Sequence, residues 1–173
     1  MSNRNPLVTI VLGSTSDWKV MEKAAQTLND FQIPFEIQAL SAHRTPEAVV
    51  DYIKNIEQRG AKVIIAGAGL AAHLPGVIAA HTTLPVIGVP VSSSISLNGW
   101  DAVLSILQMP PGIPVATVGL DNAMNAAILA LQILSLTDEA IKQRFADYKQ
   151  SLKNKIIKAN ETFKEISFEY KVN

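Results

Sequence analysis

Short apolar runs rich in β-branched residues recur along the chain and are separated by longer stretches with a different periodicity. Each run ends near Gly, Ser or Pro, as the buried strands of a parallel sheet do. The runs are LVTIVLG (7–13), FEIQAL (35–40), KVIIAGAG (62–69), PVIGVPV (85–91) and IPVATVG (113–119). They predict five buried parallel strands.

The stretches between these runs carry apolar residues at three- and four-residue steps, the spacing of an amphipathic helix. This spacing is clear over 17–30 and 46–59 and weaker over 74–81, 100–108 and 123–135. Thr45, Pro46 and Glu47 are of the types preferred at the N-cap and in the first turn of a helix. Alternating strands and helices predict an α/β fold, a three-layer α/β/α sandwich with a flavodoxin-like five-stranded parallel sheet.

The last part of the chain has a longer helical pattern. Apolar residues keep helical spacing from Thr137 to Ile166, which predicts a helix at about 137–168 with Thr137 as its N-cap. A helix of about 30 residues is about 45 Å long, against about 17–20 Å for a typical strand. We therefore expect one domain over 1–173, with a core at about 7–135 and the helix packed on a neighbouring subunit. The alternative is a helix broken near 153–158 and followed by a disordered tail.

Composition restricts the partners and the compartment. Lys plus Arg and Asp plus Glu both number 15, so no net charge attracts nucleic acid. No apolar run approaches the roughly 20 residues of a membrane span, and the N-terminal segment lacks the features of a signal peptide. The absence of cysteine excludes disulfides and thiolate metal sites and agrees with a reducing compartment. We expect a cytoplasmic protein without nucleic-acid or membrane partners.

A polar loop, GSTSD (13–17), follows the first predicted strand, at the sheet edge where open parallel sheets bind ligands. Ser14 and Ser16 can donate hydrogen bonds to a phosphate near a helix N-terminus. Asp17 would repel a phosphate, so we expect its carboxylate to accept hydrogen bonds from sugar hydroxyls of the same ligand. An equally simple interpretation is that Ser16 and Asp17 only cap a helix.

The loop after the second predicted strand, SAHRT (41–45), brings together a histidine and an arginine. Arg44 can bind a phosphate through two parallel hydrogen bonds. The histidine side chain can gain or lose a proton near neutral pH, so His43 can carry a proton in either direction. A histidine at a strand end is also commonly a structural hydrogen-bonding residue, so this loop alone does not decide its role.

The third loop, AGAGLAAHLPG (66–76), is built of small residues, which allow backbone N–H groups to approach a planar ring or a carboxylate. The alternative is a glycine-rich turn in which His73 caps the next helix. The three histidines lack metal-ligand spacing, so we expect no metal site, and no G-x-S-x-G motif indicates a serine hydrolase. The remaining groups suit proton transfer on a small phosphorylated sugar derivative. Loops 90–101 and 108–119 can close the pocket, but spacing assigns them no individual roles.

Five segments together resemble a known family. They are GSTSD, SAHRTP, AGAGLAAHLPG, LPVIGVPV and QMPPGIPVAT, and their order and separations are similar to those of the class I N5-carboxyaminoimidazole ribonucleotide mutases of purine biosynthesis. This family includes the catalytic subunit of phosphoribosylaminoimidazole carboxylase, and the resemblance runs from about Val8 to Leu134. It implies a three-layer α/β sandwich in a homo-octamer whose active sites lie at subunit interfaces. The implied reaction converts N5-carboxyaminoimidazole ribonucleotide to 4-carboxy-5-aminoimidazole ribonucleotide without metal, ATP or organic cofactor.

The same resemblance implies a role for each site residue. Ser14 and Arg44 would bind the phosphate, Asp17 would hold the ribose hydroxyls, and His43 would carry the proton. Ser16 and Ser41 would help to bind the phosphate, and the carboxylate and CO2 pocket would be lined by Gly69, Ala71, Ala72 and His73.

Two other functions remain open. A sister class carboxylates aminoimidazole ribonucleotide directly with CO2. Arg44 and the AAHLPG segment favour the mutases, whereas the unusual lengths of segments 92–101 and 118–127 keep the carboxylase open. A non-catalytic nucleotide-binding or regulatory module is the third possibility, because a fold does not determine a function.

Overall fold

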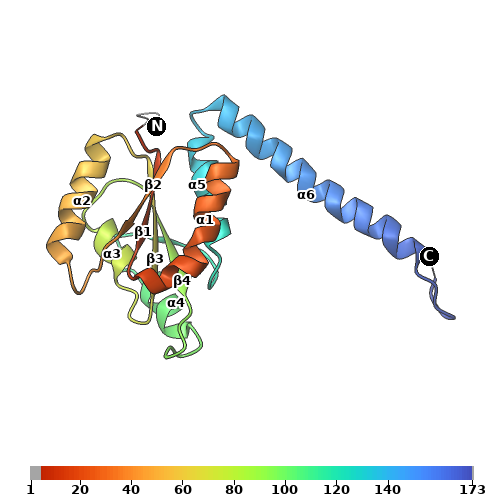
Figure 1. Ribbon diagram of the computed structural model, residues 1–173, viewed down its shortest axis with the longest axis horizontal. Helices are drawn as coiled ribbons and strands as arrows, with labels where there is room; N and C mark the ends of the chain where they lie inside the picture. Colours follow the sequence, from red (N-terminus) through yellow and green to blue (C-terminus); the bar gives the residue numbers. More distant parts are fainter. Residues whose placement is uncertain (1–4, 173) are drawn as a thin grey trace.

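The computed structural model describes residues 5–172, which form a five-stranded, all-parallel sheet (Figure 1). The strands lie in the order β2-β1-β3-β4-β5, which confirms the predicted flavodoxin-like arrangement. Their bounds are Val8–Leu12 (β1), Phe35–Ala39 (β2), Val63–Gly69 (β3), Val86–Val91 (β4) and Ala116–Thr117 (β5).

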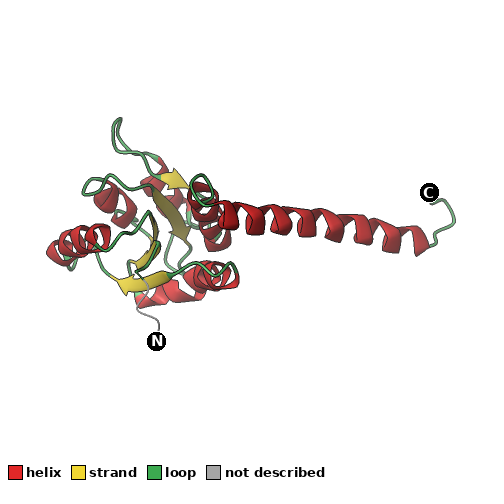
Figure 2. Cartoon of the chain, turned by 90° about the horizontal axis from the view of Figure 1, so that it is seen from above, coloured by secondary structure: helices red, strands yellow, loops and turns green. Residues whose placement is uncertain are grey.

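Helices cover both faces of this sheet, so the predicted three-layer sandwich is also confirmed (Figures 1 and 2). One face is covered by α1 (Trp18–Asp30) and α5 (Ala123–Leu134). The other face is covered by α2 (Pro46–Gln58), α3 (Leu74–Ala79) and α4 (Trp100–Leu107). Over residues 5–172, no helix combines the length and the apolar character needed to cross a bilayer.

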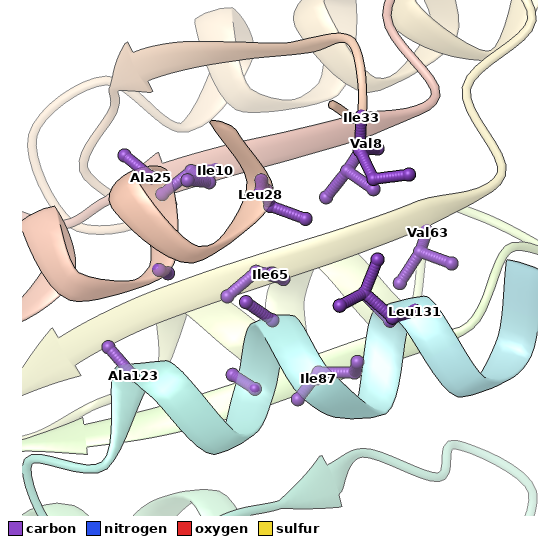
Figure 3. Packing of buried hydrophobic residues seen from close by; sticks show 14 of the residues in the cluster. Val8, Ile10, Ala25, Leu28, Ile33, Val63, Ile65, Ile87, Ala123 and Leu131 are labelled. Atoms are coloured by element: carbon purple, nitrogen blue, oxygen red, sulfur yellow. The ribbon is translucent and has the colours of Figure 1, made fainter. Parts of the chain in front are cut away.

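Alternate side chains of the central strands supply the two apolar cores between these layers. Val8 and Ile10 of β1 and Ile65 of β3 point toward α1 and α5, where they meet Leu28 and Leu131 (Figure 3). Their neighbours along the strands enter the core on the opposite face. Each fully buried side chain of this size contributes about 1.5–3 kcal/mol relative to exposure. The two cores hold the central strands firmly and therefore fix the loops at their carboxyl ends.

The two edge strands depart from the prediction. β2 is half-buried or exposed along its length, with Ile37 40% exposed, because the covering helices pack mainly over the central strands. β5 contains only Ala116 and Thr117 of the predicted run 113–119. Pro114 lacks an N–H group and cannot extend the ladder toward the start of that run. Past the strand, the Val118 N–H still donates to the Gly88 carbonyl at 3.1 Å.

The C-terminal helix, α6 (Glu139–Glu165), is a single element of 27 residues, so the alternative of a break near 153–158 is wrong. It is slightly shorter than the predicted 137–168, and its N-cap is Asp138 instead of Thr137. The Asp138 carboxylate accepts the Ile141 N–H at 3.0 Å, whereas the Thr137 hydroxyl donates to the Leu134 carbonyl.

Only the first turns of α6 pack on the sandwich. Ile141 is buried, and the Tyr148 ring meets the Phe31 ring edge-on, with 5.4 Å between their centroids. The rest of the helix stands clear of the domain (Figure 2). Its length of about 40 Å follows from 1.5 Å per residue.

Candidate active site

A pocket with a volume of about 600 Å³ lies beyond the carboxyl ends of β1, β2 and β3. All three loops singled out in the sequence line it, as expected for an open parallel sheet. The predicted site residues that line it are Ser14, Ser16, Asp17, Ser41, His43, Arg44, Gly69, Ala71 and His73. Ala72 does not line it, because its side chain is fully buried among the core residues beneath α2 and α3.

The first loop forms a 3-10 turn, Thr15–Asp17, that closes on itself. The Ser14 hydroxyl accepts the Ser16 N–H at 3.3 Å and the Ser16 hydroxyl at 2.9 Å. The Asp17 carboxylate accepts the Ser14 N–H at 3.0 Å, which completes a capping box. Asp17 also occupies the N-cap position of α1 but makes no side-chain cap there, and the capping residue of the 3-10 turn is Ser14 and not Ser16. The two serines line the pocket as well as shaping the turn.

Asp17 is the buried carboxylate of the pocket, with 7% of the residue exposed. Burial raises the pKa of the Asp17 carboxyl above its ordinary value. Hydrogen bonds from the Ser14 N–H and the Ser16 hydroxyl, and the charge of Arg44, act in the opposite direction but do not cancel the effect. Such a carboxylate suits a neutral hydroxyl ligand better than an anion.

Arg44 links the second loop to the first. Its Nη2 donates to the Gly13 carbonyl at 3.2 Å, and its Nε donates to the Ser41 hydroxyl at 3.3 Å. Both acceptors are neutral and the distances are long, so an anionic ligand would offer this guanidinium stronger partners. Thr45 is the N-cap residue of α2 as predicted, but its hydroxyl donates to the Ser41 carbonyl and makes no capping bond to the helix.

His43 and His73 meet in this pocket although 30 positions separate them in sequence. His43 Nε2 lies 2.8 Å from His73 Nδ1, and the rings are edge-to-face with 4.9 Å between their centroids. One of these nitrogens must carry a hydrogen and the other must accept it. His73 occupies the N-cap position of α3 without making a side-chain cap, so it does not serve as the local cap considered above. The pair is equipped to hold and transfer a proton.

The third loop presents backbone to the pocket. Leu70 has a left-handed φ of +56°, and the N–H groups of Leu70 and Ala71, which both line the pocket, have no acceptor among the residues described. Gly69 permits the close approach of β4, since a Cβ there would lie 2.9 Å from the Val91 carbonyl oxygen. Free N–H groups beside an imidazole pair suit a carboxylate ligand.

Sequence reasoning assigned no role to several other lining residues. They are Gly13, Ala42, Ala68, Leu70, Leu74, Ser93 and Ile95. All but the last two belong to or adjoin the three loops already singled out. Ser93 and Ile95 come from the loop after β4, where spacing predicted a closing segment but no particular residue. Over residues 5–172, no three His, Cys, Asp or Glu side chains gather as metal ligands would.

Comparison with known proteins identifies the family. The family model described as AIR carboxylase matches residues 7–155. The chain belongs to the AIR carboxylase family. Relatives in this family include proteins named N5-carboxyaminoimidazole ribonucleotide mutase. The one from Pyrococcus horikoshii is 53% identical over 169 residues, covering 98% of this chain and 95% of that protein. The one from Bacillus subtilis is 50% identical and covers 90% of this chain and 97% of that protein.

The fold of this AIR carboxylase family member is also found in solved structures. The crystal structure of PurE from Treponema denticola is 37% identical in sequence and superposes with a TM-score of 0.84. The superposition covers 92% of this chain and 99% of the Treponema denticola chain. The likeness therefore extends beyond the pocket loops to nearly the whole domain.

Proposed function

We propose that this protein is an N5-carboxyaminoimidazole ribonucleotide mutase that produces 4-carboxy-5-aminoimidazole ribonucleotide for purine biosynthesis. The observation that carries the proposal is the His43–His73 pair, which lies in one pocket with Arg44 and the free amides of the third loop. The relatives named as mutases, about 50% identical over most of the chain, support the same reaction.

The first two loops bind the ribotide end of the substrate. Arg44 exchanges its neutral acceptors for the phosphate, and the Ser14, Ser16 and Ser41 hydroxyls donate to the same group. Asp17, whose pKa is raised by burial, accepts hydrogen bonds from the ribose hydroxyls. This orientation directs the aminoimidazole ring toward the two histidines.

The proposed reaction moves one carboxyl group from N5 to C4 and exchanges one proton with His43. The bond between N5 and the carboxyl carbon breaks, its electron pair stays on nitrogen, and N5 takes a proton from His43. The electron-rich C4 then attacks the released CO2, and neutral His43 removes the C4 proton and restores the aromatic ring. His43 ends as it began, so one residue with a transferable proton is sufficient.

The third loop holds CO2 between these two steps. Gly69, Ala71 and His73 line this part of the pocket, and the N–H groups of Leu70 and Ala71 donate to the carboxylate. Ala72 is fully buried and outside the lining, so it takes no direct part. Because the N5-carbamate is already labile, confinement and proton transfer suffice, and the isomerisation requires neither metal nor ATP. We assign the protein to the cytoplasm, because a chain without cysteine is in keeping with a reducing compartment.

A side-by-side assay tests this function against direct carboxylation. We expect the purified protein to form the C4-carboxylated product from the N5-carboxy substrate well above the spontaneous rate. Aminoimidazole ribonucleotide with bicarbonate should give much slower product formation on the same preparation. Faster turnover of aminoimidazole ribonucleotide and bicarbonate would identify a direct carboxylase instead, and tight binding without either turnover would identify a binding module.

We propose further that the protein acts as a homo-octamer with active sites at subunit interfaces. Apolar side chains on the free part of α6, among them Ile156 and Phe163, are 65% and 58% exposed. A second exposed apolar group, Trp100, Leu104 and Leu107, lies on α4. Exposed apolar surface of this extent is typical of subunit contacts.

Changing Ile156 and Phe163 together to lysine is expected to convert the assembly into smaller species. The two residues are seven positions apart, so they share one face of α6, and charge there opposes burial. Light scattering coupled to size-exclusion chromatography measures the mass. The paired control, Asn154→Lys with Glu161→Lys, changes an opposite face at the same spacing and should leave the mass unchanged. Equal masses for both double variants and the wild type would rule out this face as a contact.

A further inference from the structure

The loop 92–99 after β4 and the turn 119–122 before α5 are joined to each other at the rim of the pocket. The loop supplies Ser93 and Ile95 to the pocket lining, and the Ile95 residue is 78% exposed at the mouth. The turn supplies no lining residue, yet it contacts both ends of the loop. The position of the loop therefore depends on residues that lie outside the pocket.

Asp121 holds the first end of the loop. One carboxylate oxygen, Oδ1, accepts the Ser92 N–H at 2.8 Å, and Oδ2 accepts the Ser92 hydroxyl at 2.6 Å. The Asp121 N–H donates to the Pro90 carbonyl at 2.9 Å, which ties the turn to β4. Asp121 has a φ of +57°, a left-handed conformation that non-glycine residues keep only where surrounding interactions hold them.

Leu120, the neighbour of Asp121, braces the other end of the loop. Its side chain fills the space beside Gly99, where a Cβ would lie 2.5 Å from Leu120 Cδ2. Between the two ends, the Ser96 hydroxyl accepts the Gly99 N–H at 3.0 Å and donates to the Ser93 carbonyl at 2.8 Å. Hydrogen bonds within the loop thus hold its shape, and its contacts with residues 120 and 121 set its orientation.

We infer that Asp121 is a positioning residue that fixes loop 92–99 across the mouth of the pocket. The inference rests on the proposed function, in which CO2 and aminoimidazole ribonucleotide are both present in the pocket after the N5–carboxyl bond breaks and before C4 captures CO2. A loop held in place keeps both inside until C4 captures CO2. A released loop lets them separate, so the N5-carboxy substrate is consumed while aminoimidazole ribonucleotide and CO2 escape. Asp121 then controls the fraction of substrate that becomes product, without touching the substrate.

The test is the ratio of aminoimidazole ribonucleotide released to C4-carboxylated product formed, corrected for spontaneous decay of the substrate. Asp121→Gly keeps the left-handed backbone and removes both carboxylate bonds, and it should raise this ratio roughly tenfold. Asp121→Asn retains an acceptor for the Ser92 N–H but none for the hydroxyl, so its ratio should fall between those of wild type and Asp121→Gly. A residue that only stabilised the fold would change melting temperature without changing this ratio.

Hydrogen exchange of residues 92–99 gives a second readout that does not depend on the reaction. Exchange there should be roughly tenfold faster in Asp121→Gly than in wild type, because the loop has lost its anchoring bonds. Ser92→Ala, which removes only the hydroxyl bond, should change both readouts in the same direction. It also replaces Asp121→Gly as the deciding variant if the latter does not fold. Ser94→Ala and Asp51→Asn are the controls, since both residues are exposed and Ser94 lies in the same loop, two positions from Ser92.

The outcomes separate this inference from the proposed function. If wild type forms no C4-carboxylated product, the proposed function fails, and the hydrogen exchange alone shows whether Asp121 positions the loop. If wild type is active but the Asp121 and Ser92 variants keep its product ratio and its exchange rates, Asp121 does not position the loop and the inference is overturned.

Discussion

Replacing His43 with asparagine is expected to lower the rate of carboxyl transfer by about 10²- to 10⁴-fold, the range that general acid–base catalysis contributes. Asparagine has similar polarity and can hydrogen-bond to His73, but it has no proton to exchange at neutral pH. The phosphate and ribose contacts are made by other residues, so affinity for the C4-carboxylated product should stay within about threefold. Steady-state kinetics measures the first quantity and calorimetric titration the second.

The matched control is His81→Asn, because His81 is an exposed histidine just beyond the end of α3 and outside the pocket. It should retain wild-type turnover and wild-type affinity. A His43→Asn protein that keeps its turnover would exclude His43 as the proton carrier. Loss of binding together with turnover would instead indicate that His43 holds the ligand.

The arrangement of the sheet could be predicted from the sequence because burial of a strand determines its pattern of apolar residues. Strands buried on both faces must be continuous apolar runs, and the runs at 7–13, 62–69 and 85–91 are of this kind. Once the strands are parallel, their carboxyl ends share one edge, and the loops that follow them must converge. This is why nine of the ten predicted site residues line one pocket.

The remaining details depend on three-dimensional geometry that sequence spacing does not contain. The contact between His43 and His73 needs a particular orientation of two loops, and spacing shows only that both loops lie at the same edge. The family resemblance placed Ala72 in the pocket lining, but its side chain is buried in the core. Likewise Thr45 and Thr137 have good capping chemistry, yet each bonds to a preceding carbonyl instead. Local residue type predicts such roles, and competing nearby acceptors decide them.

Replacing Arg44 with alanine is expected to raise KM by about 10²- to 10³-fold with a much smaller change in kcat. Two hydrogen bonds between a guanidinium and a phosphate are lost, and each bond to a charged partner contributes about 1.5–3 kcal/mol. Because the phosphate lies away from the reacting carbon, this binding is lost about equally from ground state and transition state. Initial rates over a range of substrate concentrations separate KM from kcat.

Arg44→Lys shows whether the geometry or the charge of the guanidinium is responsible for phosphate binding, and Arg59→Lys is the control outside the pocket. Lysine keeps the charge of Arg44 but not the planar pair of donors, so its KM should lie between those of wild type and Arg44→Ala. Arg59 pairs with Glu36 at the opposite end of β2, at 2.6 and 2.5 Å, and Arg59→Lys should lower stability while leaving KM unchanged. An Arg44→Ala protein with normal KM and greatly reduced kcat would move Arg44 from phosphate binding to the chemical step. His43 and Arg44, adjacent in sequence, thus have separable roles: loss of the first is expected to reduce kcat and loss of the second to raise KM.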